Sequence, residues 1–255
     1  MADRSVADRS ATRHGSTAAL RATWSFGVPE IDRHLPMHGF DPAAIHEFQP
    51  GSYGDTAAAL ALALRLAVGR QAASTEGRRP IVWCQSRVFG LEWGRPYGPG
   101  LAQLGLRPGE LVVVEPARQA DTLWALEEVL RSGAAAAVIG ALGEVDLTEA
   151  RRLALAAAST TTPGLFVTKA GVAGIGAAHT RWGVRAHASA PHALGLAAPG
   201  RIRLALRLER CRPMAACADD DWFHVEWCDV AHRFRLATPL ADRAPRDEPA
   251  WRRAG

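Results

Sequence analysis

Apolar residues recur in blocks along the chain from residue 24 onward, and the lengths of these blocks separate strands from helices. Short apolar runs bounded by turn-forming residues are typical of buried strands, whereas longer Ala- and Leu-rich segments predict helices. The short runs are residues 45–48, 81–84, 111–115, 135–139 and 164–168. The helical segments are residues 55–68, 121–131 and 147–159, with a shorter one near 101–104. Strands and helices that alternate in this way predict a mostly parallel sheet flanked by helices.

The pattern changes toward the end of the chain. Four strand-like runs follow one another without a helical segment between them, at residues 182–187, 202–209, 223–227 and 233–236. Such runs predict an antiparallel extension of the sheet at its C-terminal end. We therefore expect a single α/β domain at residues 23–237. A polar, disordered leader at 1–22 and a Pro- and charge-rich, flexible tail at 238–255 flank it.

Neither end of the sequence indicates export or membrane insertion. No stretch approaches the roughly 20 apolar residues that a membrane span needs. The leader has no apolar core of the kind found in secretory signals. We expect a cytoplasmic protein without membrane contacts.

The four cysteines do not form a recognisable metal motif. Cys84, Cys211, Cys217 and Cys228 contain no C-x-x-C pair, and no histidine stands at zinc-finger spacing to them. Cys84 lies in an apolar run and is interpreted as a small buried residue. A metal site made from the other three cysteines and a histidine is the alternative. We favour incidental reduced thiols and expect no metal ion.

The charge balance is weak evidence for a nucleic-acid partner. The formal net charge is +4, which would ordinarily favour polyanions. However, the basic residues are almost all arginines scattered along the chain, and Lys169 is the only lysine. This bias indicates a compositional preference rather than a charged patch.

A loop rich in turn formers follows the first strand-like run, where a phosphate-binding loop would lie. The motif G-x-x-x-x-G-K-[ST] uses its lysine for the outer phosphates and its hydroxyl for Mg²⁺. The corresponding residues are Gln49, Pro50, Gly51, Ser52, Tyr53, Gly54, Asp55 and Thr56. The second glycine and the threonine are present, but Gln49 replaces the first glycine and Asp55 replaces the lysine.

The charge reversal at Asp55 argues against nucleotide hydrolysis. Two unit charges 4 Å apart interact by roughly 4 kcal/mol at an effective dielectric constant near 20. Asp55 turns that attraction for phosphate into repulsion. As a plain charge at a helix N-terminus, the same residue contributes about 0.3–1 kcal/mol of stabilisation. We interpret the loop as a non-functional remnant and expect no nucleotide cofactor.

Two other parts of a nucleotide-hydrolysing site are missing as well. A metal-binding acid should end an apolar strand, but the best candidate, 135–139, ends in Gly140. Glu144 and Asp146 lie beyond it, and a solvated turn is the favoured role for both. After the strand 81–84, where a general base could stand, the residues are Gln85, Ser86 and Arg87. We therefore expect no enzymatic activity.

Short segments in a fixed order along the chain resemble a known family. The segment Phe26-Gly27-Val28-Pro29-Glu30-Ile31-Asp32 followed by His46-Glu47 is similar to the entry of a RecA-type core. The remaining segments resemble ImuA, the RecA-related family of bacterial ImuA–ImuB mutagenesis operons. They are residues 82–84, 97–101, 123–128, 131–134, 180–182, 208–212, 225–227 and 232–236. The resemblance spans residues 20–236.

This resemblance implies a RecA-like P-loop fold and a role in DNA repair. An ImuA-like protein would be a damage-induced accessory of the SOS response, acting in error-prone translesion synthesis. Its partners would be an ImuB-like protein, RecA and, indirectly, an error-prone replicative-type polymerase. The degenerate loop, the missing acid and the short leader depart from RecA itself, and the short leader argues against filament formation.

Candidate contact residues are few. In a RecA-like core, the segment at 170–180 would contact DNA, but here it is small and nearly uncharged, so we expect weak or absent direct DNA binding. Trp124, Trp182 and Trp227 are interpreted as core residues, and His46 and His232 as structural histidines. Tryptophan and arginine are enriched at binding hot spots. The interaction candidates are Trp93 in the Gly/Pro-rich stretch 90–100, Arg181, and Trp251, Arg252 and Arg253 in the tail.

We expect a non-catalytic scaffold in error-prone DNA repair, and two alternatives stay open. The surviving Gly54 and Thr56 allow an ATP-dependent, recombinase-like enzyme with an unusual loop. A relative of the division inhibitor SulA is the other alternative, because that family is also RecA-related.

Overall fold

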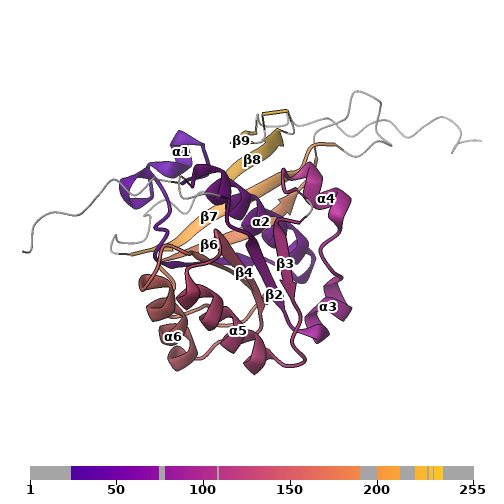
Figure 1. Cartoon of the computed structure of the whole chain (residues 1–255). Coiled ribbons are helices and arrows are strands. Elements are labelled where there is room, and N and C mark those ends of the chain that lie inside the picture. Colours follow the sequence, from indigo (N-terminus) through magenta and orange to yellow (C-terminus); the bar gives the residue numbers. More distant parts are fainter. Residues whose placement is uncertain are drawn as a thin grey trace, which may run out of the picture.

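The computed structural model describes residues 24–74, 78–107, 109–189, 200–212, 222–228, 230–231 and 233–237. They form one nine-stranded sheet in the order β3-β2-β4-β5-β1-β6-β7-β8-β9 (Figure 1). The strands are β1 Ile45–Pro50, β2 Ile81–Gln85, β3 Leu111–Val114, β4 Ala137–Leu142, β5 Gly164–Thr168, β6 Thr180–His187, β7 Arg203–Cys211, β8 Phe223–Cys228 and β9 Arg233–Leu236. The helices are α1 Pro29–Asp32, α2 Thr56–Ala73, α3 Arg87–Trp93, α4 Gly98–Gln103, α5 Gln119–Ser132 and α6 Leu147–Ala158. Two 3₁₀ turns lie at Pro36–His38 and Tyr53–Asp55.

The sheet has a parallel half and an antiparallel half. In the parallel half, neighbouring strands pair in parallel in the order β3, β2, β4, β5, β1 and β6. In the antiparallel half, β6, β7, β8 and β9 pair in antiparallel fashion. The predicted parallel sheet with an antiparallel C-terminal extension is therefore confirmed. The first strand of the chain, β1, lies between the last two parallel strands, β5 and β6.

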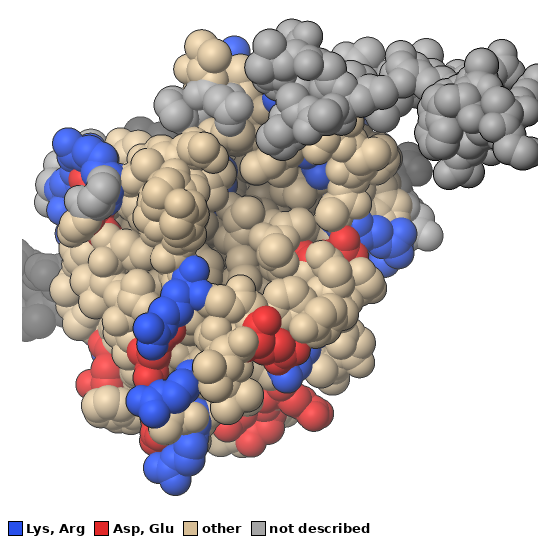
Figure 2. All heavy atoms as spheres, turned by 90° about the vertical axis from the view of Figure 1, so that its right-hand side faces the viewer, with Lys and Arg blue, Asp and Glu red and all other residues tan. Residues whose placement is uncertain are grey.

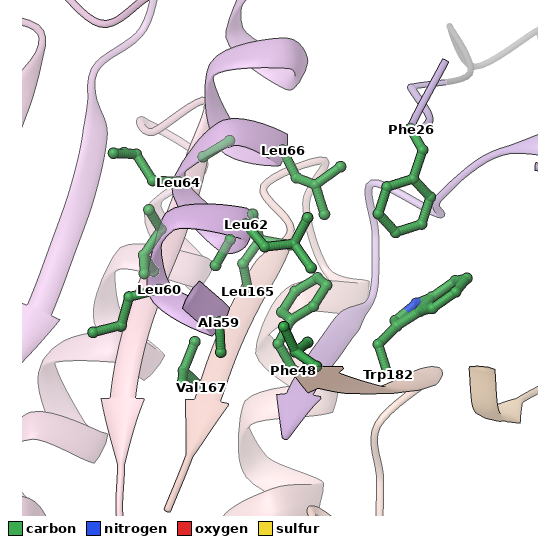
Figure 3. Packing of buried hydrophobic residues seen from close by; sticks show 14 of the residues in the cluster. Phe26, Phe48, Ala59, Leu60, Leu62, Leu64, Leu66, Leu165, Val167 and Trp182 are labelled. Carbon is green, nitrogen blue, oxygen red and sulfur yellow. The ribbon is translucent and has the colours of Figure 1, made fainter. Parts of the chain in front are cut away.

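Helix α2 covers one face of the sheet. Its Ala- and Leu-rich sequence is apolar around most of its circumference, as expected for a buried helix. Figure 3 shows its leucines lying over β5, the strand that carries Leu165 and Val167, with Phe48 beside them. Phe26 and Trp182 close the same cluster next to Phe48, with their ring centroids 4.8 Å apart.

Helices α5 and α6 cover the opposite face of the parallel half. Leu126, Leu130 and Leu153 pack on it against Phe166 and its neighbours. Gly140 of β4 allows this close approach, because a Cβ atom there would lie 2.8 Å from the Phe166 ring and 2.9 Å from Leu126. The central parallel strands β2, β4 and β5 thus alternate between two buried surfaces.

The described elements cover only one of the two faces of the antiparallel half. The segment from Trp24 to Phe40 packs on the same side as α2, where Phe26 meets Trp182 and Phe234. Within the described residues, α2 packs beside β6 and reaches β8, where the Arg65 guanidinium lies 4.0 Å from the centre of the Trp227 ring. The other face of these strands consists mainly of polar residues.

Several element boundaries differ from the predicted ones. Helix α2 continues through Gly69 to Ala73 instead of ending at residue 68, because its packing outweighs the glycine's modest helix penalty. Helix α3 lies where a Gly/Pro-rich loop was expected, with Ser86 as its N-cap. Helix α5 begins at Gln119, two residues before the predicted start at residue 121. Strand β4 is shifted by two to three residues, to Ala137–Leu142.

The described helices include none that is both long enough and apolar enough to cross a bilayer. The predicted leader and tail lie outside the described residues, so the predicted domain limits stay predictions.

Candidate functional site

The loop after β1 connects a central strand of the sheet to the N-terminus of a buried helix. The central strand β1 ends at Pro50, Gly51 and Ser52 follow, and the short 3₁₀ turn leads directly into the buried helix α2. Phosphate loops use this position because helix N-termini present N–H groups and partial positive charge. The predicted order of strand, loop and helix is present, so the side chains decide what the loop can bind.

Asp55 connects the loop to the neighbouring strand. Its Oδ2 accepts a hydrogen bond of 2.7 Å from the Ser52 hydroxyl. Its Oδ1 accepts a hydrogen bond of 2.7 Å from the backbone N–H of Ala186 in β6. The sequence interpretation of Asp55 as a plain helix charge is therefore incomplete, because the carboxylate bridges the loop and β6.

The remaining polar groups of the loop also have partners within the chain. The Thr56 hydroxyl, expected to hold Mg²⁺ in a functional loop, donates to the Tyr53 carbonyl at 2.9 Å. The Gly51 N–H donates to the Val184 carbonyl at 2.9 Å. A Cβ atom on Gly51 would lie 2.9 Å from the Arg185 side chain, so this arginine packs directly against the loop.

The strand expected to supply a metal-binding acid supplies none. The sequence predicts that this strand ends at Gly140, but β4 continues to the fully buried Leu142. A side chain at Gly140 would collide with Phe166, so an acid has no room there. Asp146 and Glu149 form a reciprocal capping box at the start of α6, with hydrogen bonds of 2.8 and 2.9 Å. Asp146 therefore has a structural role, and the described residues contain no cluster of potential metal ligands.

A carboxylate that the sequence interpretation missed lies at the end of the neighbouring strand. Glu115 follows β3, and its Oε1 accepts a hydrogen bond of 2.9 Å from Gln85. Its Oε2 is 2.7 Å from the Arg95 guanidinium. Hydrogen bonds from Gln85 and Arg95 hold the pKa of Glu115 below its usual value, so the carboxylate is a poor proton acceptor. Only the pairing of β2 with β3 brings Glu115 and Gln85 together, which sequence spacing does not reveal.

Arg181, predicted as a contact residue, belongs to a buried ion pair. Its Nε lies 2.7 Å from Glu47 Oε2, and the two side chains are 17% and 0% exposed. Glu47 also accepts hydrogen bonds from the Thr168 hydroxyl and the Ile175 N–H. Arg181 therefore anchors the segment between β5 and β6, and any contact of Arg181 with a partner stays a prediction.

Trp93 lies at the C-terminal end of α3 rather than in a loop. It is half-buried, and its ring centroid is 4.2 Å from that of Tyr53 in the loop after β1. Trp93 borders a cavity of about 470 Å³ between α2, β2 and the connection from α3 to α4. The cavity has a mostly apolar lining that includes Trp83, Tyr97 and Trp227. Clefts of this size and lining are typical of binding sites.

Apolar side chains surround this cavity on the outer surface. Leu91 of α3 is 82% exposed, and the edge strand β3 exposes Val113 on the α2 side of the sheet. Figure 2 shows this side of the molecule as largely uncharged and hollowed near its centre, with charged atoms mostly in its lower part and at its edges. We call this surface the apolar face. It consists of Tyr53, Val88, Leu91, Tyr97 and Val113, together with the cavity.

The other tryptophans divide between core and surface. Trp182 and Trp227 are buried, as predicted. Trp124 was predicted to lie in the core but is 62% exposed on α5, because it projects from the outer side of the helix. Trp251, Arg252 and Arg253 lie outside the described residues.

Histidine and cysteine residues in the described part of the chain behave as the sequence indicated. His46 is fully buried and hydrogen-bonded to Thr180 and to the Asp41 carbonyl, so it is a structural histidine. His232 lies outside the described residues. Cys84 is buried, which raises the pKa of its thiol to about 12. Cys211 is buried and not in a disulfide, and Cys217 lies outside the described residues.

Comparison with known proteins gives one clear similarity. No protein-family model matches the chain. The chain is 29% identical over 245 residues to Protein ImuA of two Caulobacter vibrioides strains, NA1000 and CB 15. The alignment covers 91% of this chain and 95% of each relative. This similarity over nearly the whole length agrees with the resemblance to ImuA of the ordered segments in the sequence. Together they support assignment of the chain to the ImuA family, at modest sequence identity.

Proposed function

We propose that this chain is a RecA-like domain with a degenerate P-loop, and that it acts as a non-catalytic scaffold in ImuA–ImuB error-prone translesion synthesis. The similarity to ImuA supports the pathway. The bridge made by the Asp55 carboxylate supports the non-catalytic role. The apolar face supports action through protein contacts.

The Asp55 bridge is the observation on which the non-catalytic role rests. In a functional loop, a lysine at this position attracts the outer phosphates of the nucleotide. Here the Asp55 carboxylate lies at the helix N-terminus and accepts hydrogen bonds from the Ser52 hydroxyl and the Ala186 N–H. A phosphate oxygen about 4 Å away would be repelled by roughly 4 kcal/mol at an effective dielectric constant near 20. Millimolar binding is worth only about 4 kcal/mol in total, so the loop does not suit a Mg²⁺-nucleotide complex.

The apolar face is the proposed docking surface for an ImuB-like protein. Contiguous exposed apolar surface is unfavourable in water unless a partner covers it. Leu91 and Val88 project from α3, and the edge strand β3 exposes unpaired backbone groups beside them. RecA and, indirectly, an error-prone polymerase would join the assembly through this complex.

The first experiment tests the loop. We expect Asp55→Ala and Thr56→Ala proteins to support damage-induced mutagenesis at close to the wild-type frequency. We also expect purified wild-type protein to show no Mg²⁺-dependent ATP turnover above background. ATP turnover that Thr56→Ala abolishes would instead identify a recombinase-like ATPase. Loss of mutagenesis by a normally folded Asp55→Ala protein would count against a non-catalytic role.

The second experiment tests the docking surface. A Val88→Glu/Leu91→Glu variant places two charges on the apolar face, and we expect it to lose co-purification with the ImuB-like protein. Leu155→Glu on α6 is the control, because Leu155 is 72% exposed and lies on the other helical layer. Equal capture by both variants would exclude this surface. Filamentous cells on overexpression, with FtsZ recovered instead, would favour the SulA-like alternative.

A further inference from the structure

The antiparallel half of the sheet has a second face that differs from the rest of the surface. Four residues lie directly opposite one another across β6, β7, β8 and β9. His187 pairs with Arg203, Arg203 with Glu226, and Glu226 with Arg235. Residues directly opposite one another on neighbouring strands project to the same side of a sheet. We call this surface the arginine face. It consists of Arg185, His187, Arg203, Arg207, Glu209, Trp222, His224, Glu226, Arg233 and Arg235.

The opposite side of the same strands is apolar. Trp182, Val184, Leu204 and Leu206 are buried there, against α2 and the N-terminal segment. Strand alternation therefore places the arginines on the side away from the core. Among the described elements, α2 contacts these strands on the apolar side, where its Arg65 guanidinium lies 4.0 Å from the centre of the Trp227 ring of β8.

Positive charge exceeds negative charge on the arginine face. Glu226 accepts hydrogen bonds from Arg203 at 2.8 Å and from Arg235 at 2.6 Å, and Arg201 approaches at 3.3 Å. The Glu226 carboxylate thus neutralises only part of three guanidinium charges, and the second acid of the face, Glu209, pairs with Arg207 at 2.9 Å. Arg185 and Arg233 are exposed and form no ion pair with a described acid.

Aromatic rings lie between these charges. The guanidinium carbons of Arg185 and Arg207 are 4.2 and 4.9 Å from the centre of the Trp222 ring. The exposed rings of His187 and His224 have centroids 4.9 Å apart. Guanidinium and aromatic planes next to a line of positive charge are the groups on which unstacked bases rest, while the arginines hold phosphates.

We propose that the arginine face binds single-stranded nucleic acid. Phosphates contact the exposed guanidiniums, and bases lie against the arginine–tryptophan stack and the histidine pair. A duplex is read by a helix or β-ribbon that enters a groove, and no described element projects from this face. The proposal goes beyond the scaffold role, because it uses neither the loop nor the apolar face.

This proposal revises the expectation of weak or absent DNA binding, which rested on the segment at 170–180. That segment is nearly uncharged, and backbone carbonyls of Ile175 and Gly176 accept hydrogen bonds from Arg210. The arginine face is assembled from residues dispersed between 185 and 235. Their charges meet only when four strands pair, so the linear sequence shows them as scattered.

The test is a salt titration of binding to a fluorescently labelled oligodeoxythymidylate, followed by anisotropy with the full-length protein. The test variant is Arg185→Gln/Arg233→Gln. The control is Arg118→Gln/Arg151→Gln on the α5–α6 side, which removes the same charge from exposed positions. We expect the test variant to bind at least tenfold more weakly at low salt. Its plot of log affinity against log salt should be less steep by about 1.4, because each single-strand phosphate contact contributes about 0.7.

One further variant and a competitor distinguish loss of positive charge from misfolding and nucleic acid from an acidic protein as the ligand. Arg185→Lys/Arg233→Lys keeps the charge, so it should recover most of the salt dependence. Equal weakening by the test and control variants would overturn the proposal, as would absence of binding at low salt. Displacement of the oligonucleotide by polyglutamate at equal charge concentration would identify an acidic-protein site instead. Unchanged co-purification with the ImuB-like protein would show that this result is independent of the proposed scaffold role.

Discussion

His46 shows how one buried polar residue connects the start of the central strand to its surroundings. Its Nε2 lies 2.9 Å from the Asp41 carbonyl, which can only accept, so Nε2 carries the proton. Its Nδ1 then accepts a hydrogen bond from the Thr180 hydroxyl at 2.9 Å. Both ring nitrogens are satisfied while the ring is neutral. Burial lowers the pKa of His46 to about 4.

This environment predicts a loss of stability in mild acid. The unfolded chain takes up a proton near pH 6.5, whereas the folded state does so only near pH 4. The contribution of His46 is therefore complete above pH 6.5 and is lost as the pH falls toward 4. We expect His46→Gln to be destabilised by about 1–3 kcal/mol at pH 7.5, because a buried hydrogen bond is lost.

Urea unfolding between pH 7.5 and 4 measures this effect. The free energy of unfolding should fall less steeply with decreasing pH in His46→Gln than in the wild type. Some dependence should remain, because burial also lowers the pKa of the neighbouring His179. Parallel pH profiles for the two proteins would show that His46 does not titrate as described.

At the scale of elements, two helix ends are fixed by residues next to them in the sequence. Asp146 caps α6, and Gly133 ends α5 in the left-handed conformation with φ of 65°. Thr148, in the first turn of α6, makes no capping bond. The two residues therefore provide a matched pair.

We expect Asp146→Ala to lower the free energy of unfolding by about 1 kcal/mol, the usual cost of a lost N-cap. Thr148→Ala, in the same turn, should change stability by less than about 0.5 kcal/mol, as is typical of surface substitutions. Urea unfolding at neutral pH compares the two variants. Equal effects would mean that the capping box does not stabilise α6.

The strand pattern and the outline of the loop could be predicted because they depend on local sequence. Strand β5 was predicted with its observed limits, Gly164–Thr168, and the loop was placed before the correct helix. Helix α3 was missed because Gly90 and Gly94 make its segment look like a loop, whereas the Ser86 cap and the packing of Phe89 stabilise it. The partners of Asp55 and Arg181 lie on strands distant in sequence, so no local pattern could reveal them.

At the scale of the whole molecule, buried carboxylates organise many of the arginines. Glu226 is the centre of such a cluster and holds β7, β8 and β9 together through Arg203 and Arg235. Burial raises the pKa of the Glu226 carboxyl, but the hydrogen bonds from Arg235, Arg203 and Arg201 outweigh it and lower the pKa to about 2.

The antiparallel half should therefore weaken in strong acid. Because the folded pKa of Glu226 is depressed, its contribution is complete above pH 4.5 and is lost as the pH falls toward 2. We expect Glu226→Gln to lower the thermal midpoint at pH 7 and to speed hydrogen exchange in β8 and β9. The difference from the wild type should narrow between pH 4.5 and 2. A constant difference across this range would show that the charge of Glu226 is not responsible.

The position of β1 has a consequence for biosynthesis. This strand is made first, yet its two neighbours, β5 and β6, begin only at Gly164 and Thr180. At about 5–20 residues per second, a ribosome needs on the order of ten seconds to reach them. During that time the nascent chain has an apolar helix and a strand with two unpaired edges. Truncated translation products should therefore depend on chaperones until β6 has emerged.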